Sequence, residues 1–386
     1  GVGDVTNDGH DDIAVGAPLA DHVSGVTLKD TGSVTVLSGA DASVIFTTYG
    51  VYAGDRLGTS VALAGDVNNN ISPDIHVIAG APLADRNSLG VITKDLGSVR
   101  IYNAANGSLL AERFGTGVKD NFGATVAAAG DVDSDGYDDV LVGAPLADKS
   151  TTTVVNTVPK TVVTKDVGHV QLLSGSVLTL DSGGIMRTFE GEKALDGFGR
   201  ALAGNADVNN DGLLDIAIGA PLVDTTATVS GKPVVRKDTG RIYVYTASTG
   251  VERFRLQGAA AGDQFGGAVG LISDLNGDNR DDLVVGSAKA DRINVVGIKT
   301  TVVKDTGRVS CYSGQTQAEL FSVPGKLTTD YFGAAINVMG DVNGDGFSDV
   351  IVGAWGDDIP AVVKGKNVSL KNAGHVEVLS GKAAVE

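Results

Sequence analysis

Six acidic segments recur along the chain, and each places oxygen donors at the same positions. They begin at Asp4, Asp66, Asp131, Asp207, Asp274 and Asp341, so successive copies lie 62 to 76 residues apart. Counting the first Asp as position 1, side-chain oxygens recur at positions 3, 5 and 9, and position 6 is glycine in most copies. Hard oxygen ligands at alternating positions of a tight turn suit Ca²⁺, and glycine accepts the positive φ that folds such a turn around an ion. The pattern predicts calcium-binding loops.

The expected ligands are the side chains at positions 1, 3, 5 and 9 together with the backbone carbonyl at position 7. In the third to sixth loops they are Asp131, Asp133, Asp135, Tyr137 and Asp139; Asp207, Asn209, Asp211, Leu213 and Asp215; Asp274, Asn276, Asp278, Arg280 and Asp282; and Asp341, Asn343, Asp345, Phe347 and Asp349. The first loop offers Asp4, Thr6, Asp8, His10 and Asp12. Its hydroxyl at position 3 predicts weaker binding or an additional water ligand.

The second loop departs furthest from the pattern. Its expected ligands are Asp66, Asn68, Asn70 and Asp74, of which only two are carboxylates. Ile71 replaces the glycine and Pro73 precedes the last ligand, so calcium occupancy of this loop stays open. We therefore expect five or six Ca²⁺ ions as cofactors. Their role is structural, because the protein itself saturates the ligand set and leaves little room for a substrate.

Two other interpretations of the acidic loops were weighed. An EF-hand requires a glutamate at position 12 and flanking helices, whereas the first copy has Val15 there, within an expected strand. Asx-rich turns that cap strands without any metal are the remaining alternative. The formal net charge of -17 favours cations, because clustered carboxylates repel one another when no ion is bound.

The sequence between the acidic loops predicts the elements that position them. After each loop come a Gly-Ala-Pro-like segment, a Thr/Val-rich stretch, a Lys-Asp/Asn-x-Gly turn and two further strands. A D-x-[FL]-G element and a strand of small residues then lead to the next loop. A repeat of about 67 residues with four antiparallel strands and no helix is typical of a propeller blade. The predicted fold class is an all-β propeller of four-stranded blades.

The order of these motifs resembles the FG-GAP repeat of the integrin α-subunit propeller. F-G, then D-x-[DN]-x-D-G-x-x-D, then G-A-P recur over essentially the whole chain, which is expected to form one domain over 1–386. Integrin propellers have seven blades, whereas this chain has six acidic loops. Six blades are favoured, with an incomplete first and last blade, and seven is the alternative if terminal residues are missing from this chain.

Composition limits the partners. The acidic balance disfavours nucleic acid, and no apolar run reaches the roughly 18 residues of a membrane helix, so direct membrane insertion is not expected. Cys311 is the only cysteine, so no internal disulfide can form. The five histidines are scattered, and no zinc spacing, nucleophile elbow or phosphate loop is present, so the chain is not expected to be an enzyme.

The segments between Gly-Ala-Pro and Lys-Asp differ in length and are expected to form hairpin extensions. The resemblance implies that they lie on the ligand-binding face, opposite the calcium loops. The repeated Lys-Asp pairs are interpreted as turn caps and salt bridges between blades, and Trp355 as packing at the rim. The favoured function is an extracellular, secreted or cell-surface adhesion module that binds a protein or carbohydrate ligand, as one part of a longer multidomain chain. An accessory propeller of a secreted enzyme and a polysaccharide-active enzyme are the alternatives.

Overall fold

The computed structural model describes residues 1–68, 75–155, 158–177, 184–296, 299–363 and 366–381. Within these ranges the chain forms 34 strands and a single 3-10 turn at Gly175–Val177. The chain divides into two compact units, one comprising 1–205 with 247–250 and the other 206–246 with 251–386. Strand β18 (Ala201–Ala206) contains the division between them. Within the described ranges, no helix is long and apolar enough to cross a membrane.

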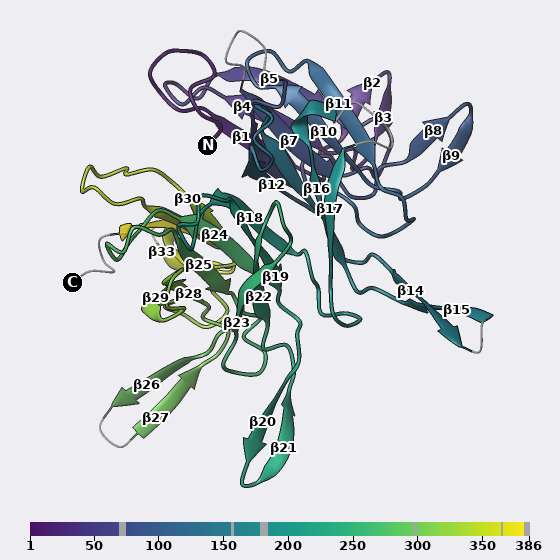
Figure 1. The fold of residues 1–386 in the computed structure, drawn as a ribbon. Helices are drawn as coiled ribbons and strands as arrows, with labels where there is room; N and C mark the ends of the chain where they lie inside the picture. The colour runs from purple at the N-terminus through teal and green to yellow at the C-terminus, as the bar shows by residue number, and fades with distance from the viewer. Residues whose placement is uncertain (69–74, 156–157, 178–183, 297–298, 364–365, 382–386) are drawn as a thin grey trace. The chain divides into compact units, whose positions relative to one another are not determined.

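The first unit contains three antiparallel sheets of three or four strands, in addition to two-stranded hairpins (Figure 1). The first sheet has the order β1-β4-β5, with β1 Ile13–Ala17, β4 Ser33–Leu37 and β5 Val44–Tyr49. The second has the order β6-β7-β10-β11, with β6 Ser60–Gly65, β7 His76–Ala81, β10 Ser98–Asn103 and β11 Leu109–Phe114. The third has the order β12-β13-β16-β17, with β12 Thr125–Gly130, β13 Asp139–Ala144, β16 His169–Leu173 and β17 Ile185–Glu190.

The second unit repeats this strand order. Its sheets contain β19 Asp215–Ala220, β22 Arg241–Thr246 and β23 Glu252–Gln257; then β24 Ala268–Ile272, β25 Asp282–Ser287, β28 Arg308–Tyr312 and β29 Glu319–Pro324; then β30 Ala335–Val338, β31 Val350–Ala354 and β34 His375–Leu379. The described chain thus has a six-bladed propeller arrangement of antiparallel sheets. The first sheet lacks an innermost strand and the last lacks a fourth, as the sequence predicts.

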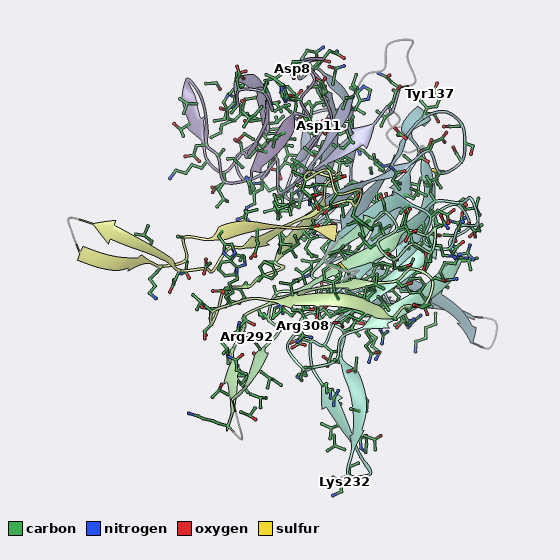
Figure 2. All side chains as sticks on the ribbon, turned by 90° about the vertical axis from the view of Figure 1, so that its left-hand side faces the viewer. Asp8, Asp11, Tyr137, Lys232, Arg292 and Arg308 are labelled. Atoms are coloured by element: carbon green, nitrogen blue, oxygen red, sulfur yellow. The ribbon has the colours of Figure 1, made fainter. Side chains whose placement is uncertain are left out.

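A two-stranded hairpin connects the second and third strands of every blade. These hairpins are β2 (His22–Ser24) with β3 (Val26–Leu28), β8 (Arg86–Ser88) with β9 (Val91–Thr93), β14 (Lys149–Val155) with β15 (Val158–Thr164), β20 (Thr225–Val229) with β21 (Lys232–Arg236), β26 (Arg292–Val296) with β27 (Lys299–Val303), and β32 (Ile359–Val363) with β33 (Lys366–Leu370). Lys232 marks the tip of β20-β21 and Arg292 the base of β26-β27 (Figure 2). The expected hairpin extensions are confirmed.

The second strand of each complete blade lies in the core. Every residue of β7, β13, β19 and β25 is buried. Continuous burial on both faces explains why these segments are runs of Val, Ile, Leu and Ala rather than alternating patterns. The apolar clusters of each unit gather around these strands, for example Ile78, Val140 and Val142 in the first unit.

The two glycine motifs meet where neighbouring blades approach each other. A Cβ on Gly80 of the second blade's Gly-Ala-Pro would lie 1.9 Å from the carbonyl oxygen of Gly123, in the Phe-Gly of the third blade. Gly123 has a φ of +87°, and its amide N–H donates to the carbonyl of Gly143 at 3.0 Å. Phe122, which precedes it, is buried. Only glycine permits this approach of two backbones, which explains why the glycine of each motif is kept even where its neighbours in the motif change.

Candidate metal centre

The acidic loops connect the first and second strands of the blades. The third loop follows β12, and Asp139 at its position 9 is also the first residue of β13. The position 9 carboxylates are buried at the end of the loop, whereas the position 5 carboxylates are exposed in the first, third and fourth loops and half-buried in the fifth and sixth. The position 9 residues are Asp12, Asp139, Asp215, Asp282 and Asp349, each at most 1% exposed. Each of these five loops therefore holds one carboxylate fixed within the protein and others that are at least partly exposed.

Backbone amides shape the third loop around its carboxylates. Asp131 at position 1 accepts the N–H groups of Asp135 and Gly136, both at 3.0 Å. Asp135 in turn accepts the N–H of Tyr137 at 3.0 Å. The same position 1 contacts recur for Asp4 with Asp8 and Gly9, Asp207 with Asp211 and Gly212, Asp274 with Asp278 and Asn279, and Asp341 with Asp345 and Gly346. The same position 7 contacts recur for His10, Leu213, Arg280 and Phe347.

The buried carboxylate at position 9 locks the loop to the blade. Asp139 Oδ2 accepts the N–H of Val132 at 3.0 Å, and Oδ1 accepts the N–H of Gly175 at 2.9 Å. A Cβ on Gly175 would lie 2.2 Å from the carbonyl oxygen of Asp138, so glycine is required there. Equivalent bonds to the second oxygen join Asp12 to Gly39, Asp282 to Gly314 and Asp349 to Gly381. The loop is therefore shaped by its own hydrogen bonds in this structure.

The third loop brings three carboxylates together. One oxygen each from Asp131, Asp133 and Asp139 lies within 4.8 Å of the others. Burial raises the pKa of Asp139 from 3.8 to about 7, and the pKa of Asp133 is raised by burial and by the Asp135 carboxylate. Like charges held at such distances disfavour ionisation unless a cation neutralises them. A convergent set of carboxylate oxygens fits Ca²⁺, which neutralises charge without other chemistry.

An asparagine occupies position 3 in the fourth to sixth loops. Its amide nitrogen lies near the position 9 carboxylate, at 3.1 Å for Asn209 and Asp215, 3.3 Å for Asn276 and Asp282, and 3.4 Å for Asn343 and Asp349. Burial raises the pKa of Asp215 and of Asp282 to about 6. To ligate an ion, each amide would turn its oxygen inward. In the first loop Thr6 donates only its backbone N–H to Asp12, at 3.2 Å.

Histidine takes the position of the buried carboxylate in the second blade. Residues Asn70 and Asp74 lie outside the described residues, whereas Asp66 and Asn68 are described. Strand pairing aligns His76 with Gly65, as it aligns Asp139 with Gly130 in the third blade. His76 is fully buried. The second loop is thus two residues longer than the others, and its anchor is an imidazole.

The His76 ring repeats the contacts of the aspartate that it replaces. Its Nδ1 lies 3.3 Å from the amide nitrogen of Val67 and 3.0 Å from the carbonyl oxygen of Gly65. Its Nε2 lies 3.2 Å from Nδ2 of Asn68. The histidine could have been found in the sequence by counting back from Gly-Ala-Pro instead of forward from Asp66. An imidazole side chain supplies no negative charge, so this blade is the least suited to calcium.

Position 8 carries a contact that the sequence did not predict. Asp138 Oδ2 accepts the N–H of Asp66 at 2.7 Å, and the amide N–H of Asp138 donates to the carbonyl of Asp66 at 2.9 Å. In the second unit, Asp281 and Asp207 form the same two contacts, at 2.8 and 3.3 Å. In the sequence, the sign of this contact was the pair of adjacent aspartates at positions 8 and 9 of the loop. These carboxylates join the acidic loops of neighbouring blades.

The repeated Lys-Asp pairs stabilise the bases of the hairpins. Asp148 Oδ1 accepts the N–H of Asp166 at 3.1 Å, and its other oxygen pairs with Lys165. The backbone contact recurs for Asp21 with Asp30, Asp85 with Asp95, Asp224 with Asp238, Asp291 with Asp305, and Asp358 with Asn372. The turn-capping role is confirmed. In each described lysine–aspartate ion pair the two residues flank the same hairpin and belong to the same blade. The expectation of salt bridges between blades is therefore wrong for these pairs.

Trp355 in the last blade stacks on an aromatic neighbour. Its ring lies 4.4 Å from that of Tyr331, with the planes 9° apart, while the residue remains 61% exposed. This packing agrees with the interpretation of Trp355 as a rim residue.

Known proteins share the repeats seen here. A family model described as FG-GAP repeat matches residues 1–37, 122–158 and 198–245. Integrin alpha pat-2 of Caenorhabditis elegans is 32% identical over 247 residues, which are 60% of this chain and 18% of that protein. Integrin alpha-V of Gallus gallus is 30% identical over 230 residues, covering 57% and 20%. Integrin alpha-8 of Gallus gallus is 29% identical over 269 residues, covering 66% and 22%.

The chain therefore spans about a fifth of the length of these curated relatives. A crystal structure described as BBS1N in complex with ARL6DN, soaked with lead, covers 94% of this chain and 79% of that one, at 10% identity and a TM-score of 0.45. That similarity is too weak to assign anything further. The matched repeats and the blade topology make this chain similar to FG-GAP repeat β-propellers. It resembles the N-terminal propeller of integrin α subunits.

Proposed function

We propose that this chain is a calcium-stabilised, non-catalytic propeller that binds a protein or carbohydrate ligand at the cell surface or in the extracellular matrix. Calcium would be held by the acidic loops of the first, third, fourth, fifth and sixth blades. The ligand would contact the hairpins between the second and third strands. As in the integrin relatives, the propeller would be one part of a longer protein.

The observation that carries the proposal is the position and exposure of the hairpins. In each blade the acidic loop lies at the start of the second strand, and the hairpin follows its end. Apolar side chains on the hairpins face solvent, including Val23 at 71%, Val91 at 68% and Ile293 at 65% exposed. Variable, exposed segments on a rigid repeat are the usual place for recognition.

The chemistry of the described residues favours binding over catalysis. Among them, the one group of three or more His, Cys, Asp or Glu side chains whose ligand atoms lie within 4.8 Å of one another is the acidic cluster of the third loop. The Cys311 thiol is buried, and burial raises its pKa, so it is a poor nucleophile. These features support a scaffold stabilised by ions that presents a recognition surface.

An array of matrix proteins and glycans tests this function. The chain should bind at least one component in calcium and lose that binding in EDTA. Variants with single hairpins shortened to a tight turn, at 22–28, 86–93 or 225–236, should include one that loses binding without a change in its melting temperature in calcium. Binding that survives shortening of all three, or turnover of a polysaccharide by this chain, would contradict the proposal.

A further inference from the structure

The fourth blade differs from the others at one position next to its acidic loop. In each of the first five blades, the third and fourth strands form five residue pairs, and a register shift before the last pair leaves one residue of the fourth strand unpaired. That residue is apolar in four blades, namely Ile45, Leu110, Met186 and Leu320, and it is Arg253 in the fourth blade. Ile45, Leu110 and Leu320 pack against the apolar clusters of their units. Arg253 therefore places a cation where the other blades place core side chains.

The Arg253 guanidinium contacts the acidic loop directly. It forms an ion pair with Asp211 Oδ2 at position 5, and its Nε donates to Thr246 Oγ1 at 2.6 Å. The same Nε lies 4.0 Å from Oδ1 of the buried Asp215. The side chain of Arg253 is only 31% exposed. Positions 5 and 9 of the loop thus both face a guanidinium.

In the other blades whose fourth strand is described, an apolar residue stands in the place of Arg253. In the first, fifth and sixth blades the residue that corresponds to Thr246 is a serine, and its hydroxyl oxygen lies 3.4 Å (Ser38 to Asp8), 3.4 Å (Ser313 to Asp278) and 2.8 Å (Ser380 to Asp345) from the position 5 carboxylate. A hydroxyl donates a proton to a carboxylate but leaves its charge in place. A guanidinium neutralises it, because arginine stays protonated at every accessible pH.

We propose that Arg253 is an internal counter-cation of the fourth loop and competes there with calcium. The proposal rests on the proposed calcium role of the acidic loops. Ca²⁺ binds carboxylate oxygens directly, so an ion entering this loop must first displace the guanidinium from Asp211. The fourth loop is consequently the weakest calcium site of the loops with position 9 aspartate, and its blade stays ordered when calcium is removed.

The test replaces Arg253 by the residue that the third blade uses at this position. Arg253→Met copies Met186, and Arg255→Met is the matched control, because Arg255 lies two residues further on the same strand and pairs with Glu252. Calcium binding is followed by titration calorimetry, and thermal melting is recorded in calcium and in EDTA. Arg253→Met should bind calcium at the fourth loop at least about tenfold more tightly, whereas Arg255→Met should match the unmodified chain.

The melting data separate the possible outcomes. In EDTA, Arg253→Met should melt at a lower temperature than the unmodified chain, because Asp211 and Asp215 lose their cation, and calcium should recover the loss. Arg253→Lys, which keeps the charge, should bind calcium like the unmodified chain. Unchanged calcium binding in Arg253→Met, or failure of that variant to fold even in calcium, would overturn the inference. An unmodified chain that binds no calcium would instead overturn the proposed role of all the loops.

Discussion

Substituting Asp139 by asparagine should reduce the pH dependence of stability in the calcium-free protein. The Asp139 carboxylate is fully buried at the end of the third loop, and burial raises its pKa from 3.8 to about 7. The folded state therefore holds a proton that the unfolded chain releases, so this group's contribution to stability is complete below about pH 4 and is lost as the pH rises through 7. Asparagine cannot titrate, which removes this contribution.

The size of the pH-dependent loss of stability follows from the raised pKa of Asp139. Between pH 5 and pH 8 the unmodified chain without calcium should lose on the order of 2 to 3 kcal/mol through Asp139 alone. Any constant cost of the asparagine, such as a weakened bond from Gly175 or Val132, cancels when the two pH values are compared. The assay is urea unfolding in EDTA at pH 5, 6, 7 and 8.

The matched control is Asp148→Asn, an exposed aspartate whose pKa Lys165 lowers. It should leave the loss of stability between pH 5 and 8 intact. Calcium should stabilise Asp139→Asn less than it stabilises the unmodified chain, because one ligand carboxylate is missing. Equal pH dependence of Asp139→Asn and the unmodified chain in EDTA would refute the argument from burial.

Two further substitutions separate ligands from structural residues. Asp345→Ala should lower the melting temperature more in calcium than in EDTA, because this half-buried carboxylate would contribute through the ion in addition to its bonds with Phe347 and Ser380. Equal losses in both buffers would remove it from the ligand set. His76→Ala should lower the free energy of unfolding by about 2 to 4 kcal/mol, equally in calcium and in EDTA, because it leaves a cavity and removes the hydrogen-bond partner of the Val67 amide. A loss of stability confined to calcium buffer would show that the second loop binds an ion.

Much of the fold was predictable because the same sequence pattern occurs six times along the chain. The glycines of Phe-Gly and Gly-Ala-Pro mark the contacts between blades, where a Cβ on Gly80 would meet the backbone of Gly123. The acidic loops were predictable because alternating oxygens and the anchor at position 9 are local in sequence. The structure adds the hydrogen bonds that preform each loop, including the glycine N–H that completes the Asp139 anchor.

The remaining features depend on contacts that sequence spacing does not reveal. His76 was missed because counting from Asp66 places position 9 at Asp74, whereas strand pairing places the anchor two residues later. Arg253 was missed because it lies 42 residues beyond Asp211 in the sequence, and only the register shift of β23 turns it toward the loop. Both departures fall where one repeat differs from the rest.

The most direct test of calcium binding is a crystal structure of the unmodified chain grown in calcium. It should show an ion in the third loop ligated by Asp131, Asp133 and Asp139, and ions in the first, fifth and sixth loops, with Arg253 or a weaker ion in the fourth. Acidic loops that contain only water at millimolar calcium would contradict the account.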